Sequence, residues 1–93
     1  MITMLNNVIE KLNNLLDDTS VVYLINDDTV SANLVITALQ TELHLSFAVA
    51  QEYMMQAHKN ERCLIYKSTT ENCKDVVAKL QRYNLTLTIE KGN

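Results

Sequence analysis

Apolar positions along the chain follow two different spacings. Residues 21–25 and 63–66 are short runs with apolar centres, and residues 85–89 alternate leucine or isoleucine with threonine. Such runs are typical of β-strands, and the strict alternation indicates a strand with one face in solvent. The sequence therefore predicts three short strands.

Between these runs, apolar residues recur every three or four positions, over 34–43, 49–57 and 73–83. This spacing is typical of amphipathic helices. Ser31 and Ser46 stand where helix N-caps are expected, and the stretch from Ser68 to Glu71 has the form of a capping box. The predicted order is β-α-α-β-α-β. Because three short strands are not stable alone, helices must cover one face of the sheet, which gives an α+β domain.

Residues 1–18 precede this core and carry a helical pattern of their own. Its apolar stripe consists of Ile2, Leu5, Ile9, Leu12 and Leu16. We expect this N-terminal amphipathic helix to end at Asp17 and Asp18, since acids are unfavourable at the negative end of a helix dipole. Two interpretations stay open: the helix packs on its own domain, or it forms an interface with a second copy of the chain. The expected division is an extension over 1–18 and a core over 19–93, in a monomer or a weak homodimer.

The chain of 93 residues is long enough for one hydrophobic core. Its formal net charge of −3 and the lack of a lysine or arginine cluster argue against a nucleic-acid partner. No apolar run reaches the length of a membrane span, and the first residues lack the basic start of a signal peptide. We therefore expect a cytoplasmic protein that does not enter a membrane.

Few residues offer catalytic or metal-binding chemistry. Cys63 and Cys73 lie in apolar patterns and are expected to be reduced core residues. With His58 they would still lack a fourth zinc ligand, so no metal is predicted. The single glycine, Gly92, stands near the end of the sequence, which excludes glycine-built nucleotide sites. The prediction is a protein that is not an enzyme and needs no cofactor.

The polar triplet Asn26-Asp27-Asp28 lies between the first predicted strand and the next predicted helix. Acidic residues there could simply favour the start of the helix through its dipole. They could instead be acceptors that face a cation. His58, one turn beyond Met54, has the same ambiguity: a histidine near a helix C-terminus can be a capping residue or a ligand-binding one.

Four segments, in order, resemble the ClpS family of Clp protease adaptors. "YLINDD" resembles the start of the family's N-D-D-Y-T-x-M motif, and "AQEYMMQAHKN" resembles its M-L-x-V-H-x-x-G helix end. "TTENCKDVVAKL" continues the likeness, and "LTLTIEK" is similar to the closing P-L-x-C-T-x-E-K strand. The resemblance covers about residues 21 to 91.

This resemblance implies a ClpS-like fold, with a three-stranded antiparallel sheet covered by helices. It also implies an adaptor that binds destabilising N-terminal residues of substrates and delivers them to a Hsp100 unfoldase, ClpA or ClpC. By resemblance the substrate's α-amino group is held by Asn26, Asp27 and His58. The implied side-chain pocket consists of Val30, Ala32, Val35, Met54, Ala57 and Leu85. Glu71 matches a family acid that faces the unfoldase.

The chain departs from the family pattern at several of these positions. Thr29, Val30 and Ala32 stand where the family has Tyr, Thr and Met, and Ala57 replaces a Val. These changes predict a wider or more apolar pocket. The family's lysine five residues after Glu71 is Val76. The alternative function is therefore a ClpS-fold interaction or regulatory module without substrate delivery, which could dimerise through the N-terminal helix.

Overall fold

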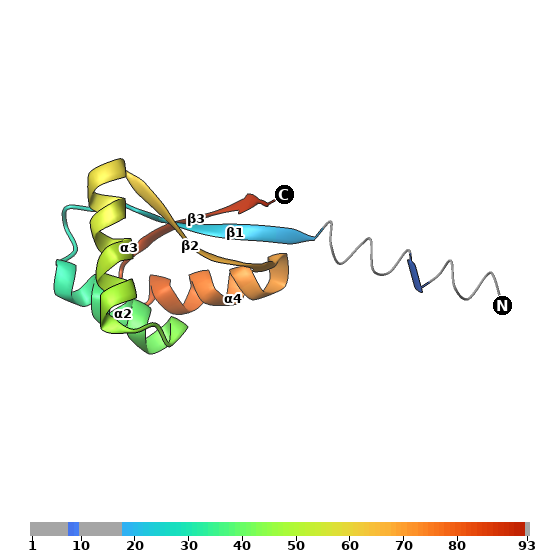
Figure 1. The fold of residues 1–93 in the computed structure, drawn as a ribbon, viewed down its shortest axis with the longest axis horizontal. Coiled ribbons are helices and arrows are strands. Elements are labelled where there is room, and N and C mark those ends of the chain that lie inside the picture. Colours follow the sequence, from blue (N-terminus) through green and yellow to red (C-terminus); the bar gives the residue numbers. More distant parts are fainter. Residues whose placement is uncertain (1–7, 10–17, 93) are drawn as a thin grey trace.

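The computed structural model describes residues 8, 9 and 18–92. Its elements are β1 (Thr19–Ile25), α2 (Ala32–Leu43), α3 (Phe47–Asn60), β2 (Arg62–Thr69), α4 (Thr70–Gln81) and β3 (Thr86–Lys91) (Figure 1). The predicted order β-α-α-β-α-β is confirmed. Of the predicted N-terminal helix, Val8 and Ile9 are described and are helical, whereas its other apolar-stripe positions lie outside the described residues.

The sheet has the strand order β2-β1-β3, and both neighbours pair with β1 in antiparallel fashion. Val22 and Leu24 of the central strand are buried, and they pair with Ile89 and Leu87 of β3. In β3 these two residues are half-buried, while Thr86 and Thr88, which alternate with them, are exposed. The alternation along residues 85–89 thus predicted the half-buried strand correctly.

The helices complete one hydrophobic core. Helices α3 and α4 pack on the sheet, and α2 packs on both of them (Figure 1). The largest fully buried side chains are Leu39 of α2, Leu80 and Cys73 of α4, and Val22 of β1. The same core cluster includes buried residues of α3 and β2, and half-buried residues of β3 pack against it.

Two of the three predicted helix caps are confirmed, and the third is shifted by one residue. The hydroxyl oxygens of Ser31 and Ser46 accept hydrogen bonds from the backbone N–H three residues later, at 3.2 Å each. The cap of α4 is Thr69, which accepts from the N–H of Asn72 at 3.2 Å, and not Ser68. Ser68 stays extended because β2 remains paired with β1 as far as Thr69.

The apolar residues at helical spacing over 49–57 predict one inward face of α3, formed by Val49, Ala50, Tyr53, Met54 and Ala57, and this prediction is partly wrong. Ala50 and Ala57 are buried and Tyr53 and Met54 are half-buried, but Val49 is 39% exposed. Neighbouring residues in a helix are turned by about 100° from each other. Since Ala50 already points to the core, Val49 is directed away from it.

Cys63 and Cys73 are free and buried, as predicted. Burial in apolar surroundings raises the pKa of both thiols. In the part of the chain that the structure describes, no three His, Cys, Asp or Glu side chains gather into a possible metal site. No helix among the described residues has the length and apolar character needed to cross a bilayer.

Candidate functional site

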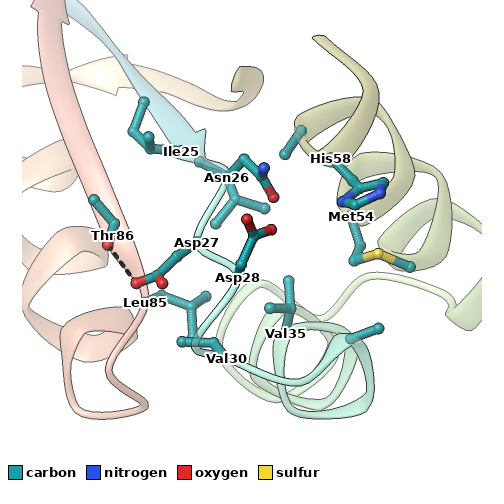
Figure 2. A pocket seen from close by; sticks show the side chains of 13 residues that line it. Ile25, Asn26, Asp27, Asp28, Val30, Val35, Met54, His58, Leu85 and Thr86 are labelled. Atoms are coloured by element: carbon teal, nitrogen blue, oxygen red, sulfur yellow. Dashed lines mark hydrogen bonds between the residues drawn. The ribbon is translucent and has the colours of Figure 1, made fainter. Parts of the chain in front are cut away.

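A cavity of about 250 Å³ opens where the end of β1 meets α2, α3 and the start of β3 (Figure 2). Its lining consists of Leu24, Ile25, Asn26, Asp27, Asp28, Val30, Ala32, Val35, Met54, Ala57, His58, Leu85 and Thr86. All nine residues that the sequence assigned to amine binding and to the side-chain pocket are among them. The structure therefore brings these residues together, and Glu71 on α4 lies elsewhere.

The loop between β1 and α2 is fixed at both ends by backbone hydrogen bonds. The N–H of Asn26 donates to the carbonyl of Glu61 at 2.9 Å, so the loop starts beside the end of α3. Glu61 is the C-cap of α3 and has a φ of 72°, a conformation that favours glycine. The N–H of Val30 donates to the carbonyl of Asp27 at 3.2 Å, which closes a turn just before α2. These bonds place the polar triplet opposite His58.

Asn26, Asp28 and His58 form the polar end of the cavity. Figure 2 shows Asn26 and Asp28 directed into the space between the loop and α3, with His58 on the α3 side of that space. Among the residues that the structure describes, none makes a hydrogen bond with these three side chains. Their acceptor atoms are therefore available to a ligand.

Asp27 is directed differently from its neighbours. Its Oδ1 accepts from the N–H of Thr29 at 2.9 Å and from the Thr29 hydroxyl at 2.6 Å. Its Oδ2 accepts from the Thr86 hydroxyl at 3.0 Å, the dashed line in Figure 2. The hydroxyl and N–H of Thr29, followed by the hydroxyl of Thr86, hold the pKa of this carboxyl below its usual value. Asp27 thus contacts β3, whereas Asp28 faces the space near His58.

The other side of the cavity is apolar, and we call Val30, Val35, Ala57 and Leu85 its apolar end. Ala57 and Leu85 are buried, and the two valines are half-buried against the core. Met54 is also half-buried and adds a flexible wall from α3. Ala32, at the first turn of α2, is exposed and stands at the mouth of the cavity.

Two polar lining residues, Asp28 and Thr86, were missing from the sequence prediction. A signal for Asp28 was present, because it belongs to the polar triplet that the sequence places between the first strand and the next helix. Thr86 had no such signal, since its contact with Asp27 joins segments that are 59 residues apart in the chain.

This arrangement suits a particular kind of ligand. An amide oxygen, a carboxylate and an imidazole nitrogen can together accept hydrogen bonds from a compact cation with several N–H donors. The apolar end can hold a hydrophobic group attached to that cation. A primary amine that carries an apolar side chain has both features.

The chain is similar to known proteins in sequence and in fold. The family model described as "ATP-dependent Clp protease adaptor protein ClpS" matches residues 15–88. Among solved structures, Agrobacterium tumefaciens ClpS2 bound to L-phenylalaninamide is similar, with a TM-score of 0.79 and 18% sequence identity. The match covers 82% of this chain and 99% of that chain, and at this identity it shows a shared fold. No curated protein matches the sequence.

Proposed function

The chain belongs to the ClpS family of ATP-dependent Clp protease adaptors, and from this premise we propose that it binds substrates by their N-terminal residue. In this proposal it recognises destabilising N-terminal residues (N-degrons) and delivers the substrate proteins that bear them to a Clp/Hsp100 AAA+ protease. One observation carries the proposal: hydrogen-bond acceptors that have no partner among the described residues face a cavity whose opposite end is apolar.

The polar end is the proposed site of the substrate's α-amino group. The amide oxygen of Asn26, the carboxylate of Asp28 and a ring nitrogen of His58 would each accept one N–H of the ammonium. We assign the carboxylate to Asp28 rather than to Asp27, the residue that the resemblance implied. The reason is that Asp27 already accepts three hydrogen bonds, two from Thr29 and one from Thr86 of β3.

The apolar end is the proposed site of the first side chain. Its side chains are apolar and offer no polar group that could select a polar side chain. The ligand of Agrobacterium tumefaciens ClpS2, L-phenylalaninamide, has a free α-amino group next to a benzyl side chain. These are the two features that the polar and apolar ends suit, which supports the proposal for this chain.

Fluorescence anisotropy with peptides that begin with Phe, Leu or Trp tests the proposal. N-acetylation removes the charge and two N–H donors, so the acceptors would be desolvated without partners, at a cost on the order of 2–4 kcal/mol. The expected loss of affinity is roughly 30- to 700-fold. A peptide with a free amine and Asp as first residue serves as the control for the apolar end. Equal affinity for free and acetylated peptides would exclude amine recognition.

Delivery to an unfoldase is a separate part of the proposal. The proposed partner is the N-domain of a ClpA- or ClpC-type unfoldase, and Glu71 is the proposed contact. Glu71 lies exposed in the first turn of α4, where Lys74 forms an ion pair with it at 3.9 Å. Glu71→Lys should weaken binding to the N-domain and leave peptide affinity unchanged.

One observation favours a second candidate, a ClpS-fold module that binds peptides without delivering them. Val76, where the family has its lysine, is 8% exposed and belongs to the core, so this position offers the unfoldase no charge. Sedimentation of the protein with an isolated ClpA or ClpC N-domain separates the candidates. A complex that Glu71→Lys weakens favours delivery, and peptide binding without any complex favours the second candidate.

A further inference from the structure

We propose that Asp27 is a positioning residue: its carboxylate ties the loop that carries Asn26 and Asp28 to β3, and it does not itself hold the amine. The inference rests on the proposed function, because it assigns a role within the same site. It differs from the implication of the family resemblance, in which Asp27 is one of the amine acceptors.

The tie is a set of three hydrogen bonds with donors from two elements. Thr29, in the same loop, donates its N–H and its hydroxyl to one oxygen, at 2.9 and 2.6 Å. Thr86, the first residue of β3, donates its hydroxyl to the other oxygen at 3.0 Å. The first pair gives the turn its shape, and the Thr86 bond fixes that turn to the edge of the sheet.

The direction of Asp27 determines the direction of its neighbours. The three residues share one short segment that backbone hydrogen bonds hold at Asn26 and at Val30, so a loop that points Asp27 toward β3 leaves Asn26 and Asp28 directed toward α3 (Figure 2). Figure 2 shows this division, with Asp27 next to Thr86 and Asp28 in the space before His58. Loss of the Thr86 bond would leave the loop attached through the backbone of Asn26 and through the turn at Val30.

The acceptor capacity of Asp27 is also largely used. A carboxylate has about four lone-pair sites, and three of them already receive hydrogen bonds. These bonds favour the ionised form and lower the pKa of the carboxyl. The tie is therefore fully present at neutral pH, and it is lost only in acid, as pH falls through the lowered pKa.

Four variants test the assignment by their affinity for a Phe-starting peptide with a free amine. Asp27→Asn keeps an oxygen for both Thr29 donors and an amide N–H that can donate to the Thr86 hydroxyl, so it should bind within about threefold of wild type. Asp27→Ala removes the tie and should bind roughly tenfold more weakly. Thr86→Val removes only the bond to β3 and should weaken binding about three- to tenfold, while Thr86→Ser should restore it.

A direct amine contact predicts the opposite pattern. Asp27→Asn would then lose the charge that holds the ammonium and would weaken binding as much as Asp27→Ala, while Thr86→Val would bind like wild type. Either result would overturn the positioning role. Melting temperatures of all four variants identify any loss of binding that comes from unfolding.

A measurement without ligand keeps this test separate from the proposed function. The carboxyl carbon of Asp27, followed by NMR through an acid titration, should titrate at higher pH in Thr86→Val than in wild type, because one donor to the ionised form is gone. An unchanged titration would mean that the Thr86 bond does not form in solution and would overturn the inference. Failure of wild type to distinguish free from acetylated peptides would instead reject amine binding.

Discussion

The two ends of the cavity are stabilised in different ways. The apolar end consists of residues that belong to the hydrophobic core or pack against it, such as the buried Ala57 and Leu85. Folding itself determines where they lie. At the polar end, Asp28 and His58 are exposed and make no hydrogen bond within the described residues. Their positions depend on the turn, on the tie from Asp27 to Thr86 and on the end of α3.

This difference indicates which substitutions should change both stability and binding, and which should change binding alone. Residues of the apolar end contribute to the stability of the domain, so their replacement changes the fold and the binding energy together. Side chains of the polar end can be replaced with little effect on stability, because exposed positions usually contribute within about 0.5 kcal/mol. The clearest tests therefore change one end at a time and measure binding and stability separately.

The largest effect is expected when the carboxylate is removed from the polar end. Asp28→Ala removes a hydrogen bond to a charged group, worth about 1.5–3 kcal/mol, which corresponds to a loss of affinity of roughly 10- to 150-fold. The melting temperature should stay close to that of wild type. Isothermal titration with a Phe-starting peptide provides the measurement.

Asp75→Ala is the matched control for this change. Asp75 is an exposed acid on α4, outside the cavity lining, and its removal changes the net charge by the same amount. It should leave affinity nearly unchanged. If the two variants lose affinity equally, the contribution of Asp28 is only its share of the net charge, and the polar end has no specific carboxylate.

The second effect concerns the shape of the apolar end at its mouth. By resemblance, the family's Met at this position crowds the β-carbon of the bound residue, whereas here the position is Ala32. A β-branched side chain should fit, and each extra buried methylene is worth about 0.8 kcal/mol. Peptides that start with Ile or Val should bind within about tenfold of the Leu peptide, a difference of roughly 1.4 kcal/mol.

Ala32→Met should restore discrimination against the β-branched residues while keeping affinity for Phe and Leu. Ala32 is exposed in the first turn of α2, so the larger side chain can be accommodated without disturbing the core. Affinities of both proteins for peptides starting with Phe, Leu, Ile and Val check the prediction. A wild-type protein that rejects Ile and Val as strongly as the variant does would contradict the wider pocket.

Much of the fold followed from the sequence because its signals are local. Hydrophobic spacing predicted the order of strands and helices, and Ser31 and Ser46 marked the starts of two helices correctly. The start of α4 was predicted one residue too early. Both Ser68 and Thr69 are good cap residues, and the choice between them is made by pairing with β1, a contact far away in sequence.

The candidate site was predicted less completely for the same reason. Family resemblance named nine of the lining residues, and it implied Asp27 as the carboxylate acceptor, a role for which we propose Asp28. The actual direction of Asp27 depends on Thr86, which belongs to a strand that joins the site only when the sheet forms. A tertiary hydrogen bond of this kind leaves no periodic pattern that a sequence could reveal.

The smallest expected effect is a dependence of binding on pH that arises at the polar end alone. His58 must present an unprotonated ring nitrogen to the amine, and imidazole is the side chain that ordinarily changes its charge near neutral pH. Affinity should therefore fall several-fold between about pH 7.5 and pH 5.5. The peptide's own amine becomes more fully charged over this range, which would strengthen its attraction to Asp28, so a fall cannot come from the ligand. His58→Gln keeps an acceptor that does not titrate and should show a flat profile. A wild-type profile as flat as that of His58→Gln would mean that His58 does not contact the amine.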